Sequence, residues 1–223
     1  MLLAAGKGTR MLPLTATTPK PLLQVADDTL IGHHLRRLRA AGIEQVVINT
    51  AYLGQQIVDA IGDGSDYGLV VTFSREAEPL ETAGGINRAL ALLGAEPFLL
   101  VNGDVWCDLP LAELAALTLP SETLGHLILV ANPEHNPSGD FSCAANRVGQ
   151  RLVGAPAYTY SGIALLRPEL VADYPERRDC FGLKEVFDWA IAQSRLSGQV
   201  YDGYWLDVGT PERLATLRRR LAG

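Results

Sequence analysis

Short apolar runs rich in β-branched residues alternate along this chain with longer stretches in which apolar positions recur at helical spacing. The apolar runs predict strands at 1–4, 44–49, 69–74, 97–101, 127–131, 158–166 and 200–207. The helical stretches predict helices at 30–41, 54–61, 85–93, 109–117, 182–194 and 211–221. Strands that alternate with helices in this way are typical of an α/β protein with a mainly parallel sheet.

Two parts of this pattern are less regular. The first strand is unusually short, so either it is abbreviated or the natural start of the protein lies upstream. The segment 133–156 is polar and rich in turn residues, and it predicts irregular loops with one or two short strands.

Composition and charge narrow the class of protein. The chain has 223 residues, of which 48% are hydrophobic, and a formal net charge of −6. A negative charge argues against general nucleic-acid binding, because such proteins need cations to displace counterions from phosphates. No apolar run is long enough to span a membrane, the N-terminus does not resemble a signal peptide, and three widely spaced cysteines predict no disulfide framework. We therefore expect a cytoplasmic protein that binds no membrane.

One predicted strand leads directly into polar residues. The buried run 97–101 is followed by Asn102, Gly103 and Asp104. In open α/β sheets, ligands bind beyond the carboxyl ends of the strands, so Asp104 is placed to contact one. A turn-forming role at the end of the strand explains the same aspartate equally well.

The segment 3–22, with the sequence LAAGKGTRMLPLTATTPKPL, combines glycines with cations. Gly6 and Gly8 let backbone N–H groups approach phosphates or a flat base. Lys7 and Arg10 lie in the same loop, and Lys20 stands between two prolines that stiffen its backbone. These features predict a polyphosphate site, with a generic glycine turn as the alternative. The spacing matches neither a Rossmann G-x-G-x-x-G, because Met11 replaces the third glycine, nor a P-loop.

This segment resembles the signature of the nucleotidyltransferases that activate sugar 1-phosphates. The similarity continues through EPLETAGG at 78–85, VNGD at 101–104, YSGI at 160–163 and WLDVGT at 205–210. It extends over essentially the whole chain, which implies a single nucleotidyltransferase domain, 1–223, with sugar-binding insertions around 133–160. The resemblance also implies the fold: a Rossmann-like three-layer α/β sandwich with a mainly parallel, mixed central sheet.

The resemblance assigns residues to each part of the site. Arg10 and Lys20 are the expected catalytic residues, since they would offset charge on the phosphoryl oxygens. Asp104 and Asp207 are the expected ligands of Mg²⁺, a cation that prefers oxygen donors. The expected nucleotide contacts are Ala4, Ala5, Gly6, Lys7, Gly8, Thr9, Arg10, Lys20, Glu78, Thr82, Gly84 and Asn102. The expected sugar contacts are Asn102, Asp140, Ser161 and Gly162.

The implied reaction is in-line attack of a sugar 1-phosphate oxygen on the α-phosphate of a nucleoside triphosphate, with release of pyrophosphate. The base remains open, because the Glu78 carboxylate can accept a hydrogen bond from uracil or from guanine, or can simply be solvated. Asp140 likewise either contacts the sugar or forms a turn after Gly139.

The middle of the chain is most similar to the N-acetylmuramate 1-phosphate uridylyltransferases, which use UTP in the recycling of cell-wall peptidoglycan sugars. The alternatives are a mannose-1-phosphate guanylyltransferase, a glucose-1-phosphate uridylyl- or thymidylyltransferase, and a nucleotide-sensing homologue without activity. Loss of Arg10, Lys20, Asp104 or Asp207 would favour the last, and none is lost. We expect a monomer or a small homo-oligomer.

Overall fold

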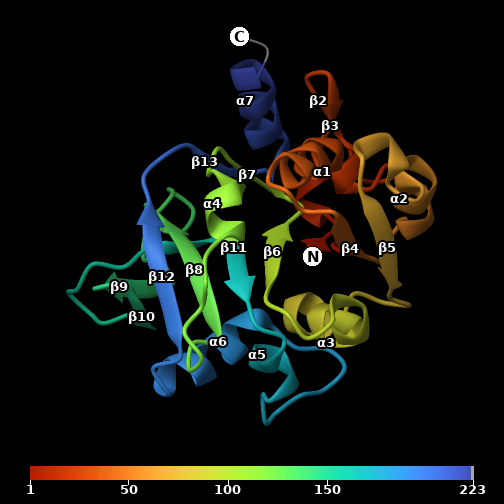
Figure 1. Ribbon diagram of the computed structural model, residues 1–223. Helices are drawn as coiled ribbons and strands as arrows, with labels where there is room; N and C mark the ends of the chain where they lie inside the picture. Colours follow the sequence, from red (N-terminus) through yellow and green to blue (C-terminus); the bar gives the residue numbers. More distant parts are fainter. Residues whose placement is uncertain (222–223) are drawn as a thin grey trace.

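A nine-stranded sheet runs through the molecule in the order β5-β4-β1-β6-β11-β8-β12-β10-β9 (Figure 1). The structure, a computed structural model, describes residues 1–221. In sheet order the strands are β5 (Val70–Arg75), β4 (Gln45–Thr50), β1 (Leu2–Leu3), β6 (Phe98–Asn102), β11 (Thr159–Leu166), β8 (Gly125–Val130), β12 (Leu196–Tyr201), β10 (Arg147–Gln150) and β9 (Phe141–Ala144). The pairings make all strands parallel to one another except β10 and β11. This confirms the predicted mixed, mainly parallel sheet.

Helices cover both faces of the sheet. On one face lie α1 (Leu30–Ala40), α2 (Gly54–Ile61) and α4 (Leu111–Ala115), and on the other lie α3 (Glu81–Leu93), α5 (Glu169–Ala172) and α6 (Leu183–Ala192). Alternate residues of β6 enter the two cores: Leu99 and Val101 pack with α1, whereas Leu100 packs with α3 and α6. A helix layer on each side of one sheet confirms the predicted three-layer sandwich.

The register of the central strands determines where polar residues meet. Leu3 of β1 is aligned with Asn49 of β4 on one side and with Asn102 of β6 on the other. Because these three strands are parallel, their carboxyl ends lie at the same edge of the sheet. The loops that follow β1, β4 and β6 therefore converge there.

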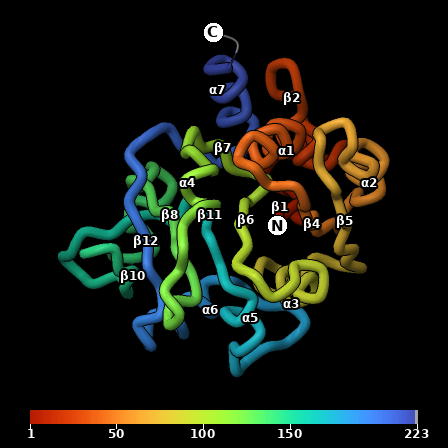
Figure 2. The backbone as a smooth tube through the Cα atoms, viewed as in Figure 1, coloured from red at the N-terminus to blue at the C-terminus, as the bar shows by residue number. Residues whose placement is uncertain are grey.

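A smaller unit of structure adjoins this edge. Strand β7 (Val105–Cys107) pairs antiparallel with β13 (Trp205–Asp207), and β2 (Gln24–Val25) pairs with β3 (Asp28–Thr29). The last helix, α7 (Pro211–Leu221), packs on the β2–β3 hairpin through a third apolar cluster, and Figure 2 shows the two side by side. Arg218 Nε donates to the backbone oxygen of Gln24 at 2.8 Å.

The prediction of one strand over 200–207 is wrong. The chain leaves the large sheet at Tyr201 and enters the small sheet at Trp205. The residues between them, including Asp202 and Gly203, form the break. The segment 133–156 does contain two short strands, β9 and β10, joined through Ala145 and Asn146, which both have positive φ.

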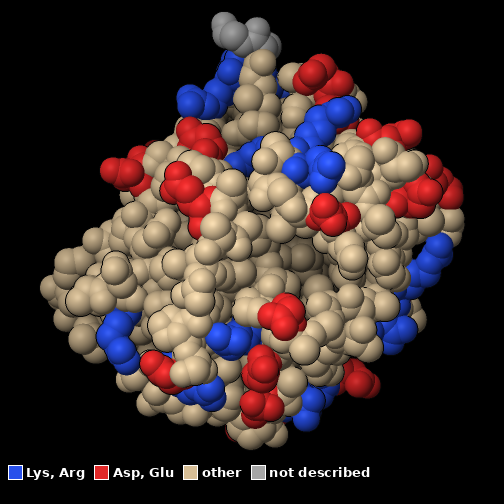
Figure 3. Space-filling view, in the orientation of Figure 1, with Lys and Arg blue, Asp and Glu red and all other residues tan. Residues whose placement is uncertain are grey.

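The surface carries both signs of charge. Figure 3 shows Lys and Arg side chains interspersed with Asp and Glu over the face in view, so this face presents no continuous basic patch of the kind that nucleic-acid binding requires. Among the described helices, none has the length and apolar character needed to cross a bilayer.

Candidate functional site

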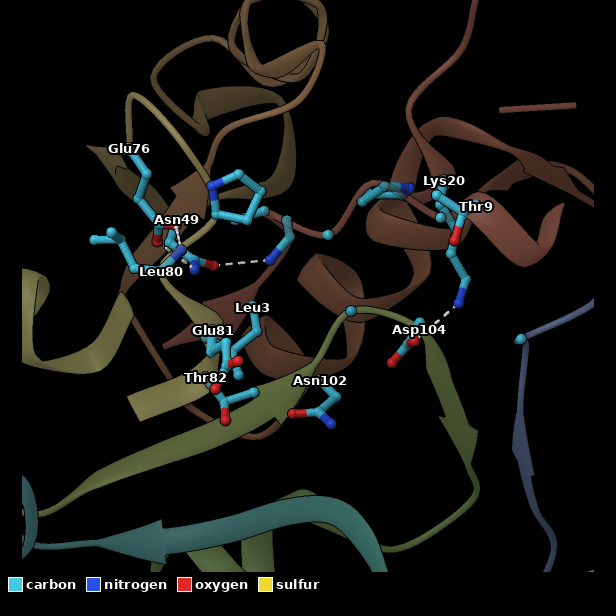
Figure 4. Close-up of a pocket in the computed structure, with 18 of the residues that line it drawn as sticks. Leu3, Thr9, Lys20, Asn49, Glu76, Leu80, Glu81, Thr82, Asn102 and Asp104 are labelled. Atoms are coloured by element: carbon cyan, nitrogen blue, oxygen red, sulfur yellow. Dashed lines mark hydrogen bonds and ion pairs between the residues drawn. The ribbon is translucent and has the colours of Figure 1, made fainter. Parts of the chain in front are cut away.

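A pocket of about 360 Å³ opens at the carboxyl ends of β4, β1 and β6. Its lining residues come from the loop after β1, from the start of α3 and from the ends of the three strands. They are Leu3, Ala4, Ala5, Gly6, Gly8, Thr9, Arg10, Lys20, Pro21, Asn49, Glu76, Pro79, Leu80, Glu81, Thr82, Asn102, Gly103, Asp104 and Gly209. Figure 4 shows Glu76 and Asn49 at one end and Lys20 and Asp104 at the other.

The Glu76 end is a chain of buried hydrogen bonds. Asn49 Nδ2 donates to Glu76 Oε1 at 2.7 Å, and Asn49 Oδ1 accepts the backbone N–H of Ala4 at 2.8 Å. The second carboxylate oxygen, Oε2, accepts the N–H of Leu80 at 3.1 Å. Only 6% of Glu76 and 2% of Asn49 is exposed. These bonds fix a carboxylate against the pocket wall and hold the first turn of the glycine loop in place.

The Lys20 end depends on close backbone packing in the glycine loop. Gly8 has φ 61°, and a Cβ atom built there would lie 3.1 Å from the Thr15 methyl group and 3.3 Å from Lys20 Cβ. Thr15 Oγ1 donates to the carbonyl oxygen of Gly8 at 2.8 Å. The loop thus folds back on itself and directs Lys20, which is 7% exposed, toward the pocket. Lys20 Nζ lies 2.8 Å from Asp104 Oδ2.

The small sheet brings the two candidate metal aspartates together. Asp104 precedes β7 and Asp207 ends β13, and the N–H of Val208 donates to the carbonyl oxygen of Asp104 at 2.7 Å. Asp207 Oδ1 contacts the Arg213 guanidinium and lies 3.2 Å from His135 Nε2. The carboxylates therefore belong to adjoining backbone segments, and each is paired with a protein cation or an imidazole.

The donor set fits a magnesium ion. Within residues 1–221 no group of three or more His, Cys, Asp or Glu side chains is arranged to hold a metal. Magnesium does not need such a cage, because it is commonly bound by one or two carboxylates together with waters and substrate phosphates. Asp104 lines a pocket that also holds Lys20 and the loop amides, and Asp207 lies two residues before Gly209, another lining residue, so the two aspartates can supply such a set.

A family model described as nucleotidyl transferase matches residues 1–222. The chain belongs to this family. One relative, the N-acetylmuramate alpha-1-phosphate uridylyltransferase of Neisseria meningitidis serogroup B, is 51% identical over 96% of this chain and 94% of its own length. The mannose-1-phosphate guanyltransferase of Eremothecium gossypii is 33% identical over 95% of this chain, which spans 61% of that relative.

The fold has relatives among solved structures too. A Bacillus anthracis protein described as a glucose-1-phosphate thymidylyltransferase superimposes with a TM-score of 0.83 over 98% of this chain and 93% of its own, at 19% identity. The comparisons confirm the resemblance to the sugar-1-phosphate nucleotidyltransferases and the prediction that the chain is an enzyme of that family.

Most residues predicted for the nucleotide of this transferase line the pocket. Those that line it are Ala4, Ala5, Gly6, Gly8, Thr9, Arg10, Lys20, Thr82 and Asn102. Of the two predicted metal ligands, Asp104 lines the pocket and Asp207 does not. Lys7 and Glu78 are exposed and do not line it. Glu76, two residues before Glu78, is buried and provides a carboxylate at the wall of the pocket.

Gly84 is buried and faces another part of the transferase. A Cβ atom built on Gly84 would lie 2.4 Å from the carbonyl oxygen of Asp179. The N–H groups of Ala83 and Gly84 donate to the carbonyl oxygen of Phe181 at 3.1 Å, and Thr82 Oγ1 accepts the N–H of Leu183 at 2.8 Å. The segment 179–183 therefore packs directly on the start of α3, and the geometry gives Gly84 a packing role there.

The residues predicted for the sugar lie on β11 and beside it. Gly162 has φ 82°, and a Cβ atom there would lie 2.8 Å from Asn102 Nδ2, so this backbone approaches the pocket wall closely. It lies where the β11–β8 register shifts, between Tyr160 and Ala164. Ser161 is fully buried, and its carbonyl oxygen accepts the indole N–H of Trp205 at 2.8 Å.

Asp140 has protein partners on both carboxylate oxygens. Oδ2 accepts the backbone N–H of Tyr160 at 2.8 Å, and Oδ1 accepts Asn136 Nδ2 at 3.0 Å. Asn136 Nδ2 also donates to Thr159 Oγ1 at 3.1 Å. These bonds attach the segment 133–140 to β11.

Sequence reasoning missed Asn49 and Glu76. Both lie at or just beyond the carboxyl end of a strand, β4 and β5 respectively, as Asp104 does after β6. That position was the available signal. It was not sufficient, because the order of the strands in the sheet decides which strand ends surround one pocket.

Proposed function

We propose that the protein transfers UMP from UTP to N-acetylmuramate 1-phosphate, giving UDP-N-acetylmuramate and pyrophosphate. The observation that carries the transfer is the joint presence of loop amides, Lys20 and Asp104 in one pocket at the strand ends. The choice of substrates rests on the 51% identity to a uridylyltransferase of nearly the same length. A role in recycling cell-wall sugars in the cytoplasm, as a monomer or small homo-oligomer, is part of the proposal.

The base would lie at the Glu76 end of the pocket. A carboxylate there accepts hydrogen bonds only, so it suits the N3–H donor of uracil. Its hydrogen bonds to Asn49 and Leu80 hold the carboxylate in one orientation before the nucleotide binds. The backbone of Ala4 to Gly6 would support the face of the base and the ribose.

The triphosphate would extend from this end toward Lys20. Arg10 and Lys20 line the pocket, as do the backbones of Gly6, Gly8 and Thr9. The sugar 1-phosphate oxygen attacks the α-phosphorus, a new P–O bond forms, and the bond to pyrophosphate breaks. The attacking phosphate is ionised at neutral pH, so no protein group has to remove a proton. The protein contributes alignment and fixed positive charge, which are the main terms in phosphoryl transfer.

Asp104 and Asp207 would hold Mg²⁺. When bound, this ion neutralises charge on the phosphate oxygens that it contacts. Lys20 would exchange Asp104 for a phosphate oxygen when the nucleotide and the ion enter, since its Nζ lies within reach of both the carboxylate and the pocket. The sugar would lie beside Asn102 and Gly162, with the segment 133–160 forming its outer wall.

Pyrophosphate release tests the function directly. The purified protein is incubated with Mg²⁺, each of the four common nucleoside triphosphates plus dTTP, and either N-acetylmuramate 1-phosphate, mannose 1-phosphate or glucose 1-phosphate. We expect turnover with UTP and N-acetylmuramate 1-phosphate, and at least tenfold less with any other pair. An Asp207→Asn variant with unchanged Mg²⁺ dependence would contradict the metal assignment.

The Glu76 carboxylate also suits guanine, because it can accept from both N1–H and N2–H. Turnover with GTP and mannose 1-phosphate alone would therefore show that the proposed substrates are wrong and that the proposed type of reaction, nucleotidyl transfer, is right. Nucleotide binding without turnover on any pair would favour the nucleotide-sensing alternative.

A further inference from the structure

Within residues 1–221, the side chains that contact the carboxylate of Asp207 all do so at one oxygen, Oδ1. Its Oδ1 contacts the guanidinium of Arg213 in the first turn of α7, and the imidazole Nε2 of His135 lies 3.2 Å away. The side chains of Asp207 and Arg213 are 17% and 20% exposed, whereas that of His135 is 41% exposed. Two elements that are far apart in the sequence therefore meet on a single carboxylate oxygen.

The other oxygen, Oδ2, lies beside Gly209, which lines the pocket. A Cβ atom built on Gly209, which lines the pocket, would lie 2.9 Å from Asp207 Oδ2 and 3.2 Å from Arg10 Nη1. Oδ2 and the guanidinium of Arg10 thus both lie close to Gly209. Because Oδ1 is taken by Arg213 and His135, Oδ2 is the oxygen left for a ligand on the pocket side.

Helix α7 holds Arg213 in this orientation. Thr210 Oγ1 accepts the N–H of Arg213 at 3.4 Å, and Leu214 and Leu217 bury the helix in the third apolar cluster. His135 belongs to the segment 133–140, which Asn136 attaches to β11. Both partners of Oδ1 are therefore carried by backbone that is itself fixed.

We propose that Arg213 and His135 are positioning residues that orient Asp207 so that its Oδ2 contacts a divalent cation brought by the nucleotide. This inference rests on the proposed function, in which Asp207 is a metal ligand. Residues behind the metal ligands commonly contribute about 10- to 100-fold to metal affinity or activity. Arg213 contributes in this way although its charge repels a cation.

The charge of Arg213 and its effect on the orientation of Asp207 would change cation binding in opposite directions, so a measurement can distinguish them. If Arg213 acted only through its charge, its removal would strengthen cation binding. If it orients Asp207, its removal frees the carboxylate to rotate and weakens cation binding. The two roles therefore predict opposite changes in the same measurement.

The measurement is the dissociation constant of UTP with and without Mn²⁺, determined by calorimetry on the full-length protein without sugar phosphate. The constant without Mn²⁺ divided by the constant with Mn²⁺ is the factor by which the metal strengthens nucleotide binding. We expect this ratio to fall about tenfold in Arg213→Met. Arg213→Lys should restore part of the wild-type ratio. His135→Ala should lower the ratio as well, by a smaller factor than Arg213→Met.

Arg219→Met is the matched control, because Arg219 lies on the same helix, is exposed and bonds only to Thr216 in the described structure. It removes the same charge and should leave the ratio at the wild-type value. A ratio that stays the same or rises in Arg213→Met, while the wild type depends on Mn²⁺, overturns the inference alone. A wild-type protein whose UTP affinity is indifferent to Mn²⁺ overturns the proposed metal role and the inference with it.

Discussion

Glu76 combines burial with hydrogen bonds that use only part of its capacity. Asn49 Nδ2 and the N–H of Leu80 each occupy one oxygen, and a carboxylate can accept about four hydrogen bonds in total. Further acceptor sites remain on a side chain that already lines the pocket. A base with an N–H donor at its edge is the natural partner of such a group.

We expect Glu76→Ala to weaken UTP binding about 10- to 100-fold, because a hydrogen bond to a charged group contributes about 1.5–3 kcal/mol. Calorimetric titration with UTP measures the change. Glu78→Ala provides the comparison, since Glu78 is exposed and does not line the pocket. A loss of binding in Glu78→Ala with none in Glu76→Ala would restore the assignment made from the sequence.

The start of α3 illustrates an element whose boundary depends on tertiary contacts. The sequence predicts a helix from residue 85, but α3 begins at Glu81, which has φ 60°. Leu80 provides no side-chain cap for it. The first N–H groups are instead satisfied by the carbonyl oxygen of Phe181, about a hundred residues later. Because the capping carbonyl group is about a hundred residues away, the sequence around residue 81 does not predict where this helix begins.

We expect Gly84→Ala to destabilise the protein by about 1–3 kcal/mol, because the new methyl group would overlap the backbone at Asp179. For a chain of this size that corresponds to a fall in melting temperature of roughly 2–4 °C per kcal/mol. Thermal unfolding followed by circular dichroism measures it. Asn87→Ala, a change on the same helix that removes atoms, should stay close to wild type. An unchanged melting temperature in Gly84→Ala would mean that the segment 179–183 can move away freely.

The elements that could be predicted are those whose information is local. The strands at 44–49, 69–74 and 97–101 and the helix at 54–61 carry strong apolar patterns, and each lies within one residue of its observed bounds. The segment 200–207 is equally apolar, but it is shared between two sheets, and apolar pattern alone does not state which sheet a strand joins.

The residues of the candidate site likewise fall into those that local sequence indicates and those that depend on how the strands pair. Lys20, Asp104 and Asp207 belong to contiguous motifs, so the sequence could indicate them. Asn49 reaches the pocket only because β4 pairs with β1 in a register that aligns it with Leu3. That pairing is a property of the folded sheet, and no residue near position 49 encodes it.

At the scale of the whole molecule, stability depends on pH through a buried histidine. His34 of α1 is 2% exposed, and burial lowers its pKa to about 3 from 6.5. The unfolded chain binds a proton below pH 6.5 that the native protein does not bind until about pH 3. The stabilisation is therefore fully present above pH 6.5 and is lost as the pH falls below it.

We expect the free energy of unfolding to fall by about 1 kcal/mol between pH 6.5 and 5.5, since one proton corresponds to about 1.4 kcal/mol per pH unit. His126, whose pKa is also lowered by burial, adds to this slope. Urea unfolding at pH 7.5, 6.5 and 5.5 measures it. His34→Gln should show a flatter dependence, and an equally steep one would assign the slope to other groups.

The origin of the small sheet has a consequence for the protein during its own synthesis. Strand β7 is translated near the middle of the chain, whereas β13 and Arg213 follow only after the large sheet has received its last strand, β12. A nascent chain interrupted before Trp205 already carries the glycine loop, Lys20 and Asp104, but it has neither the second aspartate nor the arginine that holds it. Met11 of the glycine loop packs in the third apolar cluster with Val208, Leu214 and Leu217, so this loop completes its packing only after the last segment of the chain has been translated.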